Sequence, residues 1–92
     1  MVILLKIVDY SLKYCIYILS CKTGHLYTGY TNNLKRRFAE HEKGTASKFT
    51  SARRPVTLVY KEYCSSRIQA IRREGQIKTM SRKKKFEMCK AG

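Results

Sequence analysis

The sequence predicts a single α/β (α+β) domain in which a small three-stranded antiparallel sheet is flanked by helices, in the order β-β-α-β-α-α. The strand prediction rests on three short runs rich in aromatic and β-branched residues, at 14–19, 25–30 and 56–63. The helix prediction rests on two segments with capping residues, 33–43 and 66–79, which follow the second and third runs. A chain of 92 residues has room for one such domain.

The first two strands are predicted to form a hairpin. Residues 14–19 (YCIYIL) lack charged side chains at every position, a pattern typical of a central strand that is covered on both faces. Residues 20–24 form the turn, because Gly24 can adopt positive φ there, and residues 25–30 form the returning strand. Gly29 within that strand indicates the close approach of another backbone or of a ligand.

The first helix is predicted over residues 33–43, after the N-capping side chains of residues 31–33, and it ends at Gly44. At about 100° per residue, its inward stripe consists of Leu34, Phe38 and His41, with Arg37 on the flank. Residues 45–54 are predicted to be a polar and basic loop that leads through Pro55 into the third strand.

The second helix is predicted to begin with a capping box formed by Ser66 and Gln69. The apolar residues of its inward face are Ala70, Ile71 and Ile77. Glu74 lies in the middle of the same face, which is an unusual place for a carboxylate. Ser81 caps a short last helix, residues 82–90.

The charge of the chain indicates a polyanionic partner. There are 20 lysine and arginine residues against 6 aspartate and glutamate residues, so the formal net charge is +14. Counterions released from a phosphate backbone drive the binding of such a protein, and the charge alone leaves DNA, RNA and an anionic membrane surface open as partners. Four cysteines without a CxxC pair predict free thiols and an intracellular, cytoplasmic location, associated with the nucleoid if the protein is bacterial.

The N-terminal residues are not expected to reach a membrane. The apolar run in residues 1–12 is too short to span a bilayer, and it lacks the basic start and cleavage site of a secretory signal. We therefore expect residues 1–13 to form an arm or an edge strand, outside a domain that covers residues 14–92.

Five polar side chains are predicted to converge on one site. Tyr17 and Tyr27 are nearly equidistant from the turn, so their phenols should share one face of the hairpin, and the next helix should bring Arg37 and His41 to it. Glu74 would add a carboxylate for a hard cation such as Mg²⁺. Taken singly, each residue has a structural explanation: packing for the tyrosines, solvent exposure for the arginine, a core position for the histidine, and for Glu74 a pair with the lysine four residues later.

The motifs that carry these residues resemble the GIY-YIG nuclease domain family, and within it the small stand-alone YhbQ-like branch. The resemblance covers about residues 14 to 90, nearly the whole chain. The matching segments are CIY at 15–17, YTG at 27–29, TNNLKRRFAEH at 31–41, EGQIK at 74–78 and SRKKKFE at 81–87.

The resemblance implies a metal-dependent endonuclease that cleaves DNA phosphodiester bonds. Relatives include the N-terminal nuclease of the excision-repair subunit UvrC, some homing endonucleases and some restriction enzymes. By position, Tyr17 is implied to be the proton acceptor near the attacking water, and Tyr27 to position water or phosphate. Arg37 is implied to steady the phosphate and His41 to orient groups or assist proton transfer. Glu74 is implied to hold one divalent ion, Mg²⁺ or Mn²⁺.

The chain departs from the family pattern in three places. Cys15 stands where the family has its first-motif glycine, and Thr28 replaces an isoleucine. Several members use a late asparagine, and no asparagine follows Glu74. This difference and the high charge support an alternative: a basic nucleic-acid-binding module with the nuclease fold and little or no turnover. A structural RNA-associated protein is a third hypothesis, which rests on charge alone.

Ten further cations are predicted to contact nucleic acid through its phosphates, which set affinity rather than sequence preference. They are Lys35, Arg36, Lys48, Arg53, Arg54, Arg72, Arg73, Lys83, Lys84 and Lys85. The sequence shows no separate base-reading module, so we expect an endonuclease that is structure-selective or weakly sequence-selective, or one that is directed by another protein. The resemblance implies action in DNA repair or recombination.

Overall fold

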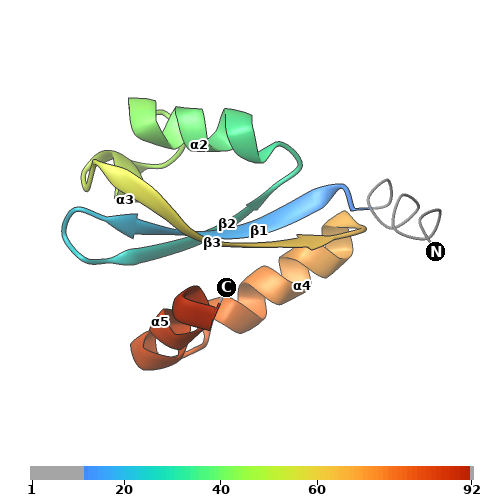
Figure 1. The fold of residues 1–92 in the computed structure, drawn as a ribbon. Coiled ribbons are helices and arrows are strands. Elements are labelled where there is room, and N and C mark those ends of the chain that lie inside the picture. Colours follow the sequence, from blue (N-terminus) through green and yellow to red (C-terminus); the bar gives the residue numbers. More distant parts are fainter. Residues whose placement is uncertain (1–11, 92) are drawn as a thin grey trace.

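A computed structural model describes residues 12–91, so the prediction for residues 1–13 falls almost wholly outside the described part of the chain. The three predicted strands are present as β1 (Tyr14–Cys21), β2 (Leu26–Thr31) and β3 (Val56–Cys64). They form one antiparallel sheet in the spatial order β2-β1-β3 (Figure 1). The run without charged residues therefore occupies the central strand, as predicted.

The predicted order of strands and principal helices, β-β-α-β-α-α, is confirmed. The principal helices are α2 (Leu34–Lys43), α4 (Arg67–Lys78) and α5 (Arg82–Ala91). The segment 45–54 differs from the prediction of a plain loop, because it contains the one-turn helix α3 (Lys48–Ser51). This turn forms because the Ser47 side chain accepts a hydrogen bond from the backbone N–H of Thr50, at 3.1 Å.

The helices cover the sheet on both faces: α2 and α3 lie on one side, and α4 and α5 on the other (Figure 1). Alternation along β1 divides its side chains between the two sides. Tyr17 and Leu19 belong to the core cluster that includes Phe38 of α2. Ile16 and Ile18 belong to the cluster that includes Ile77 of α4. No helix among residues 12–91 is both long enough and apolar enough to cross a bilayer.

The ends of α2 are formed by the residues that the sequence indicated. The Asn33 side chain accepts a hydrogen bond from the backbone N–H of Arg36, at 3.0 Å, and Gly44 ends the helix with φ of 85°. This placement sets the rotation of α2, so that His41 is buried against the sheet.

The first turn of α4 matches the predicted cap in part. Ser66 accepts a hydrogen bond from the backbone N–H of Gln69, but the Gln69 side chain accepts from the N–H of Ser65 rather than that of Ser66. The inward position predicted for Ile71 is wrong, since its side chain is 43% exposed. It lies about 100° around the helix from Ala70, which faces the sheet and is fully buried.

Candidate active site

The two phenols predicted to converge do lie together, and they are offset by two residues from directly opposite positions. Tyr17 pairs with Gly29 across the hairpin, and Tyr27 pairs with Leu19. The tyrosines are therefore diagonal neighbours on the same face, and their ring centroids are 6.4 Å apart. The element that approaches Gly29 is the ring of Tyr17, rather than the backbone or ligand that the sequence suggested.

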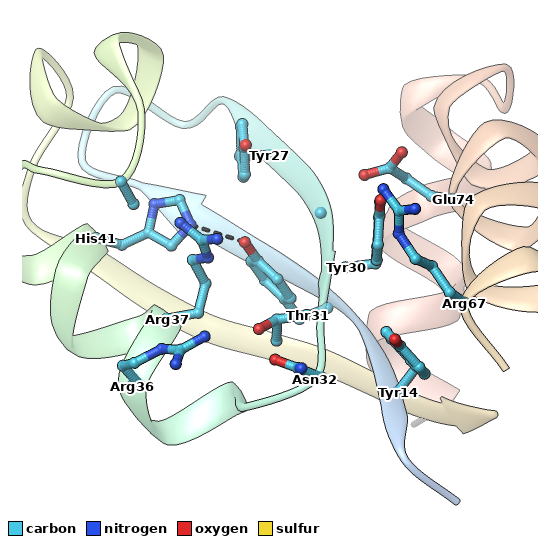
Figure 2. Close-up of a pocket in the computed structure, with 13 residues that line it drawn as sticks. Tyr14, Tyr27, Tyr30, Thr31, Asn32, Arg36, Arg37, His41, Arg67 and Glu74 are labelled. Atoms are coloured by element: carbon cyan, nitrogen blue, oxygen red, sulfur yellow. Dashed lines mark hydrogen bonds between the residues drawn. The ribbon is translucent and has the colours of Figure 1, made fainter. Parts of the chain in front are cut away.

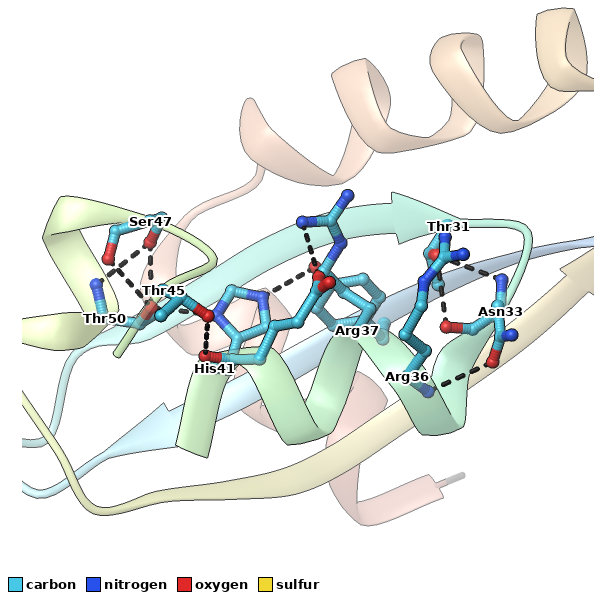
Figure 3. Close-up of polar contacts among 10 residues, drawn as sticks. Thr31, Asn33, Arg36, Arg37, His41, Thr45, Ser47 and Thr50 are labelled. Carbon is cyan, nitrogen blue, oxygen red and sulfur yellow. Dashed lines mark hydrogen bonds and ion pairs between the residues drawn. The ribbon is translucent and has the colours of Figure 1, made fainter. Parts of the chain in front are cut away.

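His41 links this hairpin face to α2 and α3. Its side chain is 1% exposed and its Nε2 atom lies 2.8 Å from the Tyr17 hydroxyl oxygen. Its Nδ1 atom lies 2.8 Å from the hydroxyl oxygen of Thr50, which in turn lies 2.8 Å from that of Ser47 (Figure 3). A continuous chain of hydrogen bonds thus runs from Tyr17 to α3.

The hydrogen bonds of His41 suit a neutral imidazole. Burial, reinforced by the positive charge of Arg37, lowers the pKa of His41 below its usual value, although Glu40 opposes the shift. A neutral ring has one donor and one acceptor nitrogen. Either Tyr17 donates to Nε2 while Nδ1 donates to Thr50, or both bonds run the other way, because a hydroxyl can serve as donor or acceptor.

Thr50 and Ser47 were not predicted as site residues. Ser47 has a recognisable local signal, because it is a serine that directly precedes a helical turn. Nothing in the local pattern indicates that Thr50 contacts His41, because this contact depends on how α3 folds back on α2. Thr50 is fully buried, so water cannot replace His41 and Ser47 as hydrogen-bond partners of its hydroxyl.

Replacing Thr50 with valine is expected to destabilise the fold by about 1 to 3 kcal/mol, because His41 Nδ1 and the Ser47 hydroxyl each lose a buried partner. Thr50→Ser retains the hydroxyl and is the matched control, with a loss expected from one methyl group only. Urea denaturation measures both free energies of unfolding. Equal losses in the two variants would show that the hydroxyl is unimportant.

Stability is also expected to fall as the pH decreases below about 6.5, the usual pKa of histidine in an unfolded chain. Above that pH, His41 is neutral in both states. Below it, the unfolded chain binds a proton that the folded chain excludes, because the folded pKa is lowered. The loss of stability continues until the pH falls to the pKa of His41 in the folded protein. Denaturation between pH 8 and pH 5 should show a shallower decline in His41→Asn than in His25→Asn, and identical slopes would refute the assignment.

Arg37 brings a guanidinium group to the same face from α2. Its Nη1 atom lies 3.1 Å from the Glu40 carboxylate in a partly exposed pair. Pairs of this kind contribute little, about 0 to 1 kcal/mol, so the guanidinium can turn to an anion at small cost. Figure 2 shows the Arg37 side chain beside His41, and both residues line one cleft with Tyr17.

Glu74 approaches from the opposite layer. It lies on α4, across edge strand β2 from Tyr27, Arg37 and His41 (Figure 2). It lines the same cleft as these residues and Tyr17. Its carboxylate lies 3.6 Å from the ammonium group of Lys78, so the pair considered from the sequence does form. The Lys78 side chain is 54% exposed, compared with 19% for Glu74. An exposed lysine can release this carboxylate to another cation at little cost.

All five predicted catalytic residues line one cleft of about 450 Å³. The cleft also contains residues that the sequence prediction missed, namely Tyr14, Tyr30, Asn32 and Arg67. A signal for Arg67 was available, since it precedes Glu74 by two helical turns and therefore shares its side of α4. The cleft thus has guanidinium groups on both walls, from α2 and from α4.

The structure separates the ten predicted phosphate-binding cations into groups. Arg36 lines the cleft. Arg53 lies over the Phe49 ring at 3.9 Å, and Arg54 donates to the Ser51 carbonyl. Arg73 donates two hydrogen bonds to Glu62, at 2.8 and 3.1 Å. Lys35, Lys48, Arg72, Lys83 and Lys84 are exposed, whereas Lys85 is half-buried.

The donors in the cleft suit a divalent ion held jointly with a substrate. Within residues 12–91, no three or more His, Cys, Asp or Glu side chains cluster as a metal cage. Glu74 contributes the single carboxylate among the described residues that line the cleft. Mg²⁺ is commonly bound by one or two carboxylates, with water and phosphate oxygens completing the shell, so this arrangement fits Mg²⁺ or Mn²⁺.

Comparison with known proteins places this geometry in a family. Residues 13–87 match the family model described as the GIY-YIG catalytic domain. A UPF0213 protein of Staphylococcus haemolyticus is 51% identical over 83% of this chain and 93% of its own length. One of Staphylococcus saprophyticus is 45% identical over 87% of this chain and 98% of its own length.

Solved structures agree with these matches. The solution NMR structure of a UPF0213 protein from Bacillus halodurans is 38% identical, with a TM-score of 0.56 over 85% of this chain and 83% of that one. An E. faecalis protein solved by the same method is 34% identical, with a TM-score of 0.58 and the same coverage. The chain therefore belongs to the GIY-YIG family, among the small UPF0213 proteins.

Proposed function

We propose that the protein is a metal-dependent endonuclease that hydrolyses DNA phosphodiester bonds, with structure-selective or weakly sequence-selective action in DNA repair or recombination. The observation that carries this proposal is the cleft itself. It brings the hydrogen-bonded pair Tyr17 and His41 together with Arg37 and Glu74. These residue types supply the proton transfer and the positive charge that phosphodiester hydrolysis needs.

Tyr17 and His41 are assigned to proton transfer. Burial, reinforced by Tyr27, raises the pKa of the Tyr17 phenol well above its usual value, although Arg37 opposes the shift. A phenol of this kind acts as a base only when a neighbour takes its proton. The Nε2 atom of His41 lies 2.8 Å away and can accept it at the same time as the Tyr17 oxygen takes a proton from the attacking water, so that no buried phenolate forms.

The cations of the cleft are assigned to the phosphate. Arg37, with Arg36 beside it on α2, offers guanidinium donors to the phosphate oxygens. Tyr27 lies in contact with His41, with ring centroids 5.2 Å apart, and can position water or phosphate. A divalent ion held by Glu74 supplies further positive charge against the charge that develops on the phosphate.

The test is cleavage of end-labelled flapped, branched, nicked and fully paired DNA in the presence of Mg²⁺ or Mn²⁺. We expect cleavage of at least one discontinuous substrate, none with a chelator, and loss of activity in Tyr17→Phe, which removes only the hydroxyl. Failure to cut any substrate with either metal would reject the nuclease proposal.

The second candidate is a DNA-binding module with little or no turnover. It is favoured by the pair between Glu74 and Lys78, which occupies the proposed metal ligand, and by the lack of a later asparagine. This candidate requires that Lys78 stays paired with the Glu74 carboxylate and so prevents it from binding a metal ion. Metal titration of the wild type and Lys78→Ala separates the two candidates, since unchanged metal affinity would remove the locking explanation.

A further inference from the structure

A second hollow adjoins the candidate active site on the other side of Tyr27, whose side chain lines both. It has a volume of about 260 Å³. Its walls come from β2, α3, α4 and α5, so it exists only in the folded domain. The residues that line it are Leu26, Tyr27, Thr28, Phe49, Lys78 and Lys85. We refer to it as the Phe49 groove.

The floor of the Phe49 groove is aromatic and apolar. The rings of Tyr27 and Phe49 are stacked, with centroids 6.0 Å apart and planes inclined by 28°. Arg53 covers Phe49, with its guanidinium carbon 3.9 Å from the ring centroid, and fixes that ring in place. Preformed aromatic surfaces beside cations are the usual means of binding an unpaired nucleobase, because every base has a face that can stack.

The rim of the groove is cationic. Lys78 and Lys85 reach it from different helices, and no acidic residue among those described lines it. Lys85 is half-buried, whereas its neighbours Lys83 and Lys84 are exposed. Lys78 is paired with Glu74 at 3.6 Å, and its largely exposed side chain can exchange that partner for an anion in the hollow at little cost.

We propose that the Phe49 groove binds one unpaired nucleotide of the cleaved strand, next to the scissile phosphate. The base lies against Tyr27 and Phe49, and the adjoining phosphate lies between Lys78 and Lys85. A nucleotide held in this way has left the duplex stack, so the substrate class is DNA with a single-stranded segment beside the cut, such as a flap. This inference rests on the proposed nuclease function and specifies its substrate.

The test compares Lys85→Ala with Lys90→Ala, which removes the same charge from an exposed position of the same helix, outside the groove and outside the cations predicted to contact phosphate. Binding is measured in a chelator, so that no cleavage occurs, to a duplex with a single-stranded thymidine flap and to the same duplex without it. We expect Lys85→Ala to weaken flap binding by about tenfold, as for the loss of one charge-assisted contact. Lys90→Ala should have a much smaller effect, and the two variants should bind the blunt duplex equally.

Equal effects of the two substitutions on flap binding would overturn the groove as a subsite. NMR spectra of the wild type with a short thymidylate provide a second readout, in which the amide signals of Thr28 and Phe49 should shift. Shifts confined to other regions would also overturn the proposal. Wild-type protein that binds neither DNA would instead refute the proposed function, so the two failures are distinguishable.

Discussion

Replacing Glu74 with glutamine is expected to reduce metal-dependent DNA cleavage on the order of 10³-fold while leaving the fold intact. Glutamine has nearly the same size but lacks the charge that a divalent ion requires, and Glu74 is the single carboxylate among the described residues that line the cleft. Its pair with Lys78 is exposed on the lysine side and contributes about 0.3 to 0.5 kcal/mol. Initial rates on labelled flap DNA measure the first effect, and urea denaturation the second.

Glu87→Gln is the matched control for Glu74→Gln. Glu87 is an exposed carboxylate on α5, outside the cleft, and its substitution changes the net charge by the same amount. Its cleavage rate should equal that of the wild type. Retention of full activity by Glu74→Gln would remove the carboxylate from the proposed metal site.

Replacing Gly29 with alanine is expected to reduce cleavage by about 100-fold and to destabilise the fold by about 1 to 3 kcal/mol. The added Cβ would lie 2.6 Å from the Tyr17 hydroxyl oxygen and 2.7 Å from the ring carbon that bears it. The ring cannot swing away freely, because Tyr17 is buried and bonded to His41. The same rate and denaturation measurements apply.

Gly75→Ala is the control for this substitution. Nothing lies within 4 Å of a Cβ built at Gly75, which is in the interior of α4. Alanine there should stabilise the helix by about 0.5 to 1 kcal/mol without affecting cleavage. A Gly29→Ala protein as active as Gly75→Ala would show that the position of the Tyr17 phenol is not critical.

Local patterns in the sequence were sufficient for the fold and for most of the candidate site. Strand alternation puts Tyr17 and Tyr27 on one face, and helix periodicity adds His41 to it, so these contacts need only a hairpin followed by a short connection. Periodicity also placed Glu74 on the sheet-facing side of its helix. The position of each of these side chains follows from the periodicity of its own strand or helix and from the order of the elements along the chain.

The features that could not be predicted depend on how separate elements pack. Thr50 becomes a partner of His41 only because α3 folds against α2. The cleft crosses the edge strand β2, so that Glu74 faces the tyrosines from the opposite layer, and periodicity within α4 contains no information about that. The role of Gly29 follows from the diagonal register of the two tyrosines, which a one-step shift of the hairpin would change.

The most direct test of the central claim is the location of a bound ion. Mn²⁺ added to isotope-labelled protein broadens the NMR signals of nearby amides. We predict selective broadening around Glu74 and around Tyr17 across the cleft, and its disappearance in Glu74→Gln. Broadening centred on another carboxylate, such as Glu62, or unchanged in Glu74→Gln, would contradict a metal-dependent active site in this cleft.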